Sequence, residues 1–231
     1  MKAAPKPIII AIDGNAASGK GTLGKRLAGR LGLAHMDTGS LYRLVALNLM
    51  NRGRDPADES RAVEAAAALN KSYKPEDSDN PLIRTDAVGA VTSQISAIPA
   101  VRDQILELQR NFAQNPPLLL DGRTPRGAIL DGRDIGTVVC PQADIKFFVT
   151  ASPETRAERR HKELQSKGIS VTYDAVLADM HERDARDAGR ATAPMKPAAD
   201  AIMLDTSTMT IDDVVAFALK KIRQKTNFAL G

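Results

Sequence analysis

The sequence predicts an α/β fold in three layers, in which a central parallel sheet is flanked by helices. Residues 8–13, IIIAID, form a continuous apolar run rich in β-branched residues, which is typical of a strand buried on both faces. Helical periodicity follows over residues 20–31, and then come the apolar piece 33–36 and a second helical segment at 40–51. This alternation of strands and helices indicates a parallel sheet with helical connections.

The same patterns predict the elements farther along the chain. Ser152, Pro153 and Glu154 indicate a helix start, because they supply an N-cap, a proline in the first turn and an acid near the positive helix end. Thr210 and Asp213 form the pattern of a capping box before a last helix, which ends near Gln224. The other predicted helices are 61–69, 101–114, 153–167 and 172–187, and the other predicted strands are 118–120, 128–130, 144–150 and 201–205.

The composition fits a globular protein with a buried core and argues against several classes of function. The 231 residues are 43% hydrophobic and carry a net charge of +4. Without Trp, and with three Tyr and five Phe, the chain has few platforms on which single-stranded nucleic acid could stack. Cys140 is the single cysteine and is expected to be a small buried side chain, and the three histidines show no metal-ligand spacing. No apolar run approaches the ~18 residues of a membrane span, so we expect a cytoplasmic protein.

Residues 14–22, GNAASGKGT, fit the pattern G-x-x-x-x-G-K and directly follow the first predicted strand. Backbone N–H groups of such a loop surround phosphate oxygens, and the N-terminus of the following helix adds positive partial charge. Lys20 would reach the terminal phosphates of a nucleoside triphosphate. The predicted triphosphate site consists of Gly14, Asn15, Ala16, Ala17, Ser18, Gly19, Lys20, Gly21 and Thr22.

The residues after Lys20 narrow the class of protein. Gly21 and Thr22 complete the sequence GKGT, which resembles nucleoside monophosphate kinases, in which the metal is held more through water. Thr22 is therefore the candidate ligand for Mg²⁺, through a water molecule. GTPases also need an N-K-x-D base reader, and the Asn70-Lys71 pair is followed by Ser-Tyr and does not match it.

A second anion site is predicted at residues 37–43, DTGSLYR, after the second predicted strand. Thr38 is the expected N-cap of a helix, and Arg43 follows about one turn later. A hydroxyl group, backbone N–H groups and an arginine at a helix start would bind an anion. The alternative is an ordinary capped helix with Arg43 in solvent.

Residues 131–139, DGRDIGTVV, end another predicted strand. Ligands of open α/β sheets collect at the carboxyl ends of the strands, which makes Asp131, Arg133 and Asp134 candidate site residues. A near copy at 121–123, DGR, lacks the continuation and is interpreted as a loop.

Two clusters of charged residues occur in predicted helices of the C-terminal half. One cluster shares a helix face, which is either a binding face or an ordinary solvated one. The other would form a lid that brings guanidinium groups to a migrating phosphoryl group. The first consists of Arg183, Arg186 or Asp187, and Arg190, and the second of Arg156, Arg159 and Arg160.

Taken together, these motifs resemble the bacterial cytidylate kinases, which are P-loop nucleoside monophosphate kinases. The resemblance covers nearly the whole chain, and its most specific segments are 37–43, 93–102 (SQISAIPAVR), 131–139 and 182–187 (ERDARD). It implies a P-loop NTPase fold in a single domain over residues 1–231, with an inserted subdomain at about 65–110 that binds the nucleoside monophosphate. A lid with nucleoside-contacting helices is expected at about 153–190.

The resemblance also implies the reaction and the role of each site residue. ATP, with Mg²⁺, would donate its γ-phosphoryl group to CMP or dCMP, and Lys20, Arg133, Arg156 and Arg160 are the expected catalytic residues. Thr38, Arg43 and Arg133 would hold the CMP phosphate. Ser93, Arg102 and Asp134 would read the cytosine, and Arg183, Asp187 and Arg190 would hold the nucleoside. We expect a monomer that binds neither nucleic acid nor a membrane.

Two segments differ from the family pattern. Residues 69–84 are short and polar where relatives often have a longer β-hairpin, and an insertion at 121–127 has no assigned role.

Two other functions stay open. One is a P-loop kinase for UMP, AMP, shikimate or dephospho-coenzyme A, which would lack the base-reading set of Ser93, Arg102 and Asp134. The other is a non-catalytic nucleotide-binding or nucleic-acid-associated regulator, whose binding to a polynucleotide would depend steeply on salt.

Overall fold

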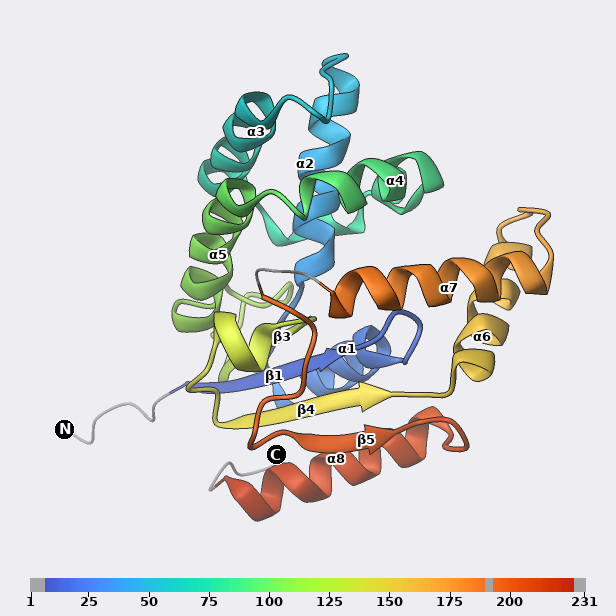
Figure 1. The fold of residues 1–231 in the computed structure, drawn as a ribbon. Helices are drawn as coiled ribbons and strands as arrows, with labels where there is room; N and C mark the ends of the chain where they lie inside the picture. Colours follow the sequence, from blue (N-terminus) through green and yellow to red (C-terminus); the bar gives the residue numbers. More distant parts are fainter. Residues whose placement is uncertain (1–6, 190–192, 227–231) are drawn as a thin grey trace. The chain divides into compact units, whose positions relative to one another are not determined.

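The computed structural model of the chain describes residues 7–189 and 193–226 (Figure 1). The chain forms two compact units. Unit 1 consists of residues 1–35 and 118–231, and unit 2 consists of residues 36–117. Unit 2 is thus continuous in sequence, whereas unit 1 is assembled from both ends of the chain.

A five-stranded sheet with the strand order β2-β3-β1-β4-β5 organises unit 1. The central strand β1 (Ile8–Gly14) pairs in parallel with β3 (Gly127–Gly132) and with β4 (Ile145–Thr150). At one edge β5 (Ile202–Asp205) pairs in parallel with β4, and β2 (Ala34–Asp37) lies at the other edge. The predicted α/β class with a parallel sheet is confirmed.

Helices flank the sheet of unit 1 (Figure 1). The helices α1 (Lys20–Leu31) and α8 (Ile211–Lys225) pack on one face through a core that includes Leu27, Val215 and Phe147. Because strand residues alternate between faces, Asp13 points to the opposite face from Ile12. Beyond β4, the helices α6 (Pro153–Ser166) and α7 (Tyr173–Ala188) pack against each other.

Unit 2 is helical. It contains α2 (Thr38–Asn51), α3 (Glu59–Ser72), α4 (Asp86–Ile95) and α5 (Pro99–Gln114), whose buried core includes Leu41, Val45, Ala66 and Ile105. The segment in which relatives were expected to have a hairpin contains two short 3₁₀ helices, η1 (Pro75–Asp79) and η2 (Pro81–Arg84). After Asp37, the described residues of this unit include no strand.

Most predicted elements are present, and the capping patterns at Ser152 and Thr210 mark the starts of their helices correctly. Ser152 Oγ accepts a hydrogen bond from Thr155 N at the start of α6, and Thr210 and Asp213 form the predicted capping box of α8. The predicted strand 118–120 is wrong. Leu120 is 99% exposed, and residues 119–123 form a turn in which Leu119 N donates to Arg123 O. An apolar run without a neighbouring strand to pair with therefore stays a loop.

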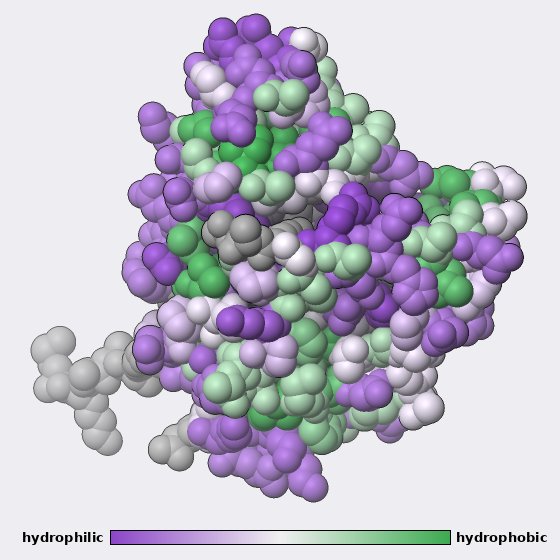
Figure 2. Space-filling view, viewed as in Figure 1, coloured by the Kyte–Doolittle hydropathy of each residue, from purple (hydrophilic) through white to green (hydrophobic). Residues whose placement is uncertain are grey.

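The surface of the protein and the state of its single cysteine are those of an ordinary globular chain. Figure 2 shows hydrophilic and hydrophobic residues interspersed over the visible face. Cys140 is buried and forms no disulfide, as expected. Among the described helices, none combines the length and the apolar character that crossing a bilayer needs.

Candidate functional site

The loop between β1 and α1 has the backbone that its glycine pattern predicts. Gly14 has a φ of 150°, and a Cβ atom at this position would lie 1.9 Å from the backbone oxygen of Val149. Only glycine therefore allows β1 to turn beside β4. The helix α1 begins at Lys20 after Gly19, and no side chain among the described residues caps its N-terminus. Its first N–H groups consequently suit an anionic ligand.

Polar groups of this loop point to the same kind of ligand. Lys20 Nζ donates to the backbone oxygen of Asn15 at 3.3 Å, so the lysine side chain folds back over the loop. Ser18 Oγ is fully buried and has no hydrogen-bond partner among the described residues. A buried hydroxyl without a partner is costly, and a phosphate oxygen would supply the missing acceptor. The loop therefore fits a bound phosphate group.

Arg133 connects this loop with the end of β3 and with α7. Its Nε donates to Asp187 Oδ2 at 2.7 Å, and its NH1 group donates to the backbone oxygen of Gly14 at 2.8 Å. Arg183 lies on the same helix as Asp187 and is half-buried. Three segments singled out in the sequence thus converge within unit 1.

Asp134 and the residues after it form a buried π-helical turn, η3 (Ile135–Val139). Asp134 is 7% exposed, and its backbone oxygen accepts from Val138 N. Asp13, at the end of β1, accepts hydrogen bonds from Ile135 N and Gly136 N, both at 2.7 Å. Burial raises the pKa of Asp13 to about 6 from its usual 3.8, although the two N–H donors act in the opposite direction.

The arginines of α6 differ in their surroundings. Arg156 is 2% exposed and forms an ion pair with Asp184 of α7 at 2.6 Å. Its guanidinium also donates to the backbone oxygens of Ala151 and Ala16. Arg160 is more exposed and pairs with Glu163. Arg156 thus joins α6 and α7 to the glycine-rich loop.

The candidate residues of unit 2 occupy three of its helices. Thr38 is buried in the first turn of α2, and Arg43 reaches from α2 to the backbone oxygen of Ile83, to which it donates at 2.8 Å. Ser93 lies on α4. Arg102, on α5, lies over the ring of Tyr42 with its guanidinium carbon 5.7 Å from the ring centre. These side chains therefore have defined positions within unit 2.

Comparison with known proteins shows which family the chain belongs to. The model of the family described as cytidylate kinase matches residues 10–224. The chain belongs to the cytidylate kinase family. It is 53% identical to the cytidylate kinase of Rhodospirillum rubrum, with 94% of this chain and 98% of that protein covered.

Further relatives agree with this family. The cytidylate kinase of Paramagnetospirillum magneticum is 52% identical, over 94% of this chain and 98% of its own length. The cytidylate kinase of Azorhizobium caulinodans is also 52% identical, over 92% of this chain and 96% of its own. An uncharacterized protein from Eubacterium ventriosum has a similar structure with a TM-score of 0.53, at 14% identity and over 94% of this chain and 98% of its own, which supports the fold alone. The family resemblance seen in the sequence is confirmed.

One helix cap and two polar pairs of this member of the family were not expected from the sequence. Asp37, not Thr38, is the N-cap of α2, because Thr38 already has helical geometry; the predicted capping role of Thr38 is wrong. Arg84 donates to Asp37 at 2.8 Å within unit 2. His35 Nε2 lies 2.8 Å from Asp131 Oδ2 in unit 1. The only sign of these contacts in the sequence was the position of Asp131 at the end of a predicted strand.

The first turn of α1, where Thr22 is exposed, lies beside a carboxylate and suits the magnesium ion that kinases of this family would use. Mg²⁺ prefers oxygen ligands and retains several water molecules. Both carboxylate oxygens of Asp131 lie 3.9 Å from the position that a Cβ on Gly21 would occupy, so negative charge lies beside the first turn of α1. Within the described part of the chain, no cluster of three His, Cys, Asp or Glu side chains forms an all-protein metal site. A water-rich ion beside Thr22 and the phosphates fits this arrangement.

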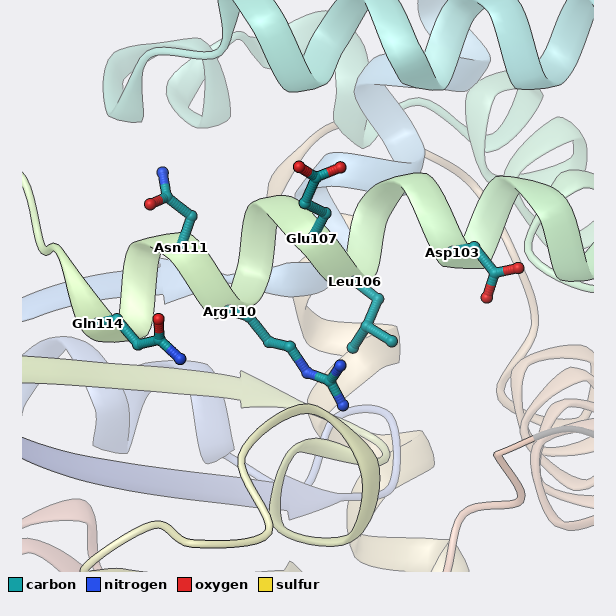
Figure 3. Close-up of a pocket in the computed structure, with 6 residues that line it drawn as sticks. All are labelled: Asp103, Leu106, Glu107, Arg110, Asn111 and Gln114. Carbon is teal, nitrogen blue, oxygen red and sulfur yellow. The ribbon is translucent and has the colours of Figure 1, made fainter.

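One candidate residue is not described by the structure, and one groove is not lined by any candidate residue. Arg190 lies outside the described residues. Figure 3 shows an open groove of about 400 Å³ along α5, and none of the candidate residues lines it. Its lining residues are Asp103, Leu106, Glu107, Arg110, Asn111 and Gln114.

Proposed function

We propose that this member of the cytidylate kinase family transfers the γ-phosphoryl group of ATP to CMP or dCMP. The products are ADP and CDP or dCDP. The observation that carries the proposal is the position of Arg133, which donates both to the phosphate loop at Gly14 and to Asp187. One arginine thereby joins the residues proposed for the donor nucleotide to residues proposed for the acceptor.

On the donor side, loop 14–22 holds the phosphates of ATP through its N–H groups, with Ser18 and Lys20 adding side-chain donors. Thr22 holds Mg²⁺ through a water molecule. When bound, the ion neutralises charge on the phosphate oxygens. The Ser18 hydroxyl, which is buried without a partner in the described residues, supports this assignment.

On the acceptor side, the proposed ligands come from several segments of the chain. Thr38, Arg43 and Arg133 bind the phosphate of CMP, because arginines match phosphate geometry with paired N–H donors. Asp187 accepts from the ribose hydroxyls. The residues proposed for the rest of the nucleoside are Ser93, Arg102, Asp134, Arg183 and Arg190.

The base-reading residues fit cytosine better than uracil. The carboxylate of Asp134 accepts from the exocyclic amine of cytosine, while Ser93 and Arg102 donate to its ring acceptors. Uracil presents an oxygen and an N–H group at two of those positions. A uracil base would therefore leave buried partners unpaired, which discriminates strongly between the two nucleotides.

The chemistry is an in-line phosphoryl transfer. An oxygen of the CMP phosphate attacks the γ-phosphorus of ATP, and the bond from that phosphorus to the bridging oxygen breaks, which releases ADP. The acceptor oxygen is already anionic, so no strong general base is needed. Lys20 and the arginines, Arg133, Arg156 and Arg160, position the reactants and stabilise the negative charge on the transferred group.

The decisive experiment measures ADP release from ATP with CMP, dCMP, UMP, AMP or no acceptor. We expect turnover with the two cytosine nucleotides, little with UMP or AMP, and still less without an acceptor. Lys20→Met serves as the matched inactive control. ADP formation without a preference for cytosine nucleotides contradicts the proposal, and steeply salt-dependent binding of a polynucleotide without turnover favours a regulator instead.

The remaining expectations stay predictions. They are a cytoplasmic monomer, an inserted monophosphate-binding subdomain at about 65–110 and a lid at about 153–190. Oligomeric state is measured directly by light scattering of the purified chain.

A further inference from the structure

Asp13 is a buried carboxylate to which neither the family resemblance nor the phosphoryl-transfer scheme assigns a role. It is 3% exposed and directly precedes Gly14, the first residue of the phosphate loop. Both of its oxygens accept backbone hydrogen bonds, Oδ1 from Ile135 and Oδ2 from Gly136. These two amides open the π-helical turn that directly follows Arg133 and Asp134.

We propose that Asp13 is a positioning residue, which fixes Arg133 and Asp134 for the acceptor nucleotide by clamping the first two amides of η3. The inference rests on the proposed function, because it assigns Asp13 a part in that same reaction. The clamp has a third bond beside it, from Arg133 NH1 to the backbone oxygen of Gly14. The end of β1 thus holds the Arg133–Gly136 segment at three points.

On the side of β4, the Lys146 side chain fills the space next to the two hydrogen bonds of Asp13. Lys146 lies on the same face of the sheet as Asp13, and its Nζ donates to Asp200 and to the backbone oxygen of Pro141. A Cβ atom on Gly136 would lie 3.1 Å from Lys146 Cδ and 3.3 Å from Asp13 Oδ2. The turn therefore fits tightly between Asp13 and the stem of Lys146, and Gly136 permits that fit.

The charged groups facing Asp13 determine how the clamp responds to pH. The pKa of Asp13 is raised to about 6, because burial and the nearby Asp134 raise it by more than the two N–H donors and Arg133 lower it. Lys146 adds a cation on the same face of the sheet. At pH 7.5 the carboxylate is ionised and accepts both bonds. Below pH 6 it becomes protonated, so that one oxygen turns into a donor facing an N–H group.

The test compares the full-length protein with Asp13→Asn, which keeps the volume but offers one acceptor in place of two. The expected result is a KM for CMP that rises about tenfold, with a KM for ATP that changes far less. Asp144→Asn is the matched control, because Asp144 also accepts a backbone N–H group of β1, from Ile9, at the opposite end of the strand. An equal rise in both KM values, or no rise, overturns the proposal.

The pH profile separates positioning from a merely structural role. The second ionisation of a phosphate monoester also falls near pH 6, but it affects both enzymes equally. The ratio of the variant's KM for CMP to that of the wild type should therefore fall toward one between pH 7.5 and pH 5.5. A constant ratio contradicts the clamp. Gly136→Ala, which presses on the same turn, should raise the KM for CMP as Asp13→Asn does.

Amide hydrogen exchange tests the clamp without any substrate. We expect faster exchange over residues 135–139 in Asp13→Asn and unchanged exchange there in Asp144→Asn. Unchanged exchange in both variants refutes the clamp. The proposed function and the clamp can fail separately. If the wild type does not phosphorylate CMP, the proposed function is refuted. If residues 135–139 still lose protection in Asp13→Asn, the clamp itself is supported.

Discussion

Arg133 Nε and Asp187 Oδ2 lie 2.7 Å apart, and the two side chains are only 14% and 5% exposed. The arginine proposed for the CMP phosphate and the carboxylate proposed for the ribose thus hold each other in place within unit 1. Because the second contact of Arg133 is the backbone of Gly14, its guanidinium has little rotational freedom. Such prior ordering lowers the entropy that substrate binding must otherwise remove.

Replacing Arg133 with alanine should lower kcat far more than it weakens ATP binding. The guanidinium is expected to stabilise charge on the transferred phosphoryl group, so its loss should reduce kcat by about 100-fold or more. Steady-state kinetics with both substrates varied, together with ATP binding by calorimetry, measures the two effects. Arg123→Ala is the control, because Arg123 is an exposed arginine paired with Asp121 in the 119–123 turn. An unchanged kcat refutes this role of Arg133.

Replacing Asp134 with asparagine should weaken the choice of cytosine over uracil. The amide offers one acceptor and also a donor, so it tolerates the oxygen that uracil presents in place of the amine. We expect the ratio of kcat/KM for CMP to that for UMP to fall by about 10- to 100-fold. Competition between the two nucleotides in one reaction measures this ratio. A ratio equal to that of the wild type assigns base reading to other residues.

Replacing Arg156 with methionine should lower stability as well as activity. The variant removes the ion pair with Asp184 and the bonds to the backbone of Ala151 and Ala16. Breaking a largely buried pair costs about 3 kcal/mol, which corresponds to a Tm lower by about 6 °C or more in a chain of this size. Arg160→Met, whose arginine is 26% exposed, should leave the Tm nearly unchanged. Calorimetry of both variants checks the contrast, and equal Tm values contradict it.

Asp13 should make the protein less stable as the pH rises from about 4 to about 6. In this window the folded state keeps a proton that the unfolded state has lost, since the folded pKa is about 6 and the usual value is 3.8. The free energy of unfolding should fall by at most about 3 kcal/mol from this group. Urea unfolding at several pH values measures the slope in the wild type and in Asp13→Asn. The variant should lack this component of the slope, and identical slopes contradict the raised pKa.

The sequence was informative where local chemistry decides the structure. The glycine-rich loop, the caps at Ser152 and Thr210 and the central strands follow from short-range patterns, and the structure contains them. Among the candidate residues of unit 1, Gly14, Arg133 and Asp134 could be named from the sequence because they lie at or just after the ends of predicted strands. The two bonds of Asp13 and the pair of His35 with Asp131 were not predicted, because they join residues 122, 123 and 96 positions apart.

Other differences have equally specific causes. Leu118 to Leu120 have strand-like composition, but they lie in no sheet. The N-cap of α2 is Asp37 and not the predicted Thr38, because the backbone of Thr38 is already helical. Local patterns do not determine such choices, since they depend on which partner strand or turn is nearby.

The division of the chain affects how it folds. Ile9 in β1 pairs with Ala128 in β3, so the two central strands meet only after the chain has passed through the whole of unit 2. Closing so long a loop is entropically costly. The helices of unit 2 pack on one another, and their contacts, such as those of α3 with α5 and of α2 with α4, span fewer residues than the pairing of β1 with β3. Contacts of shorter sequence separation form faster. We therefore expect the sheet of unit 1 to form after the helical unit that interrupts it in the sequence.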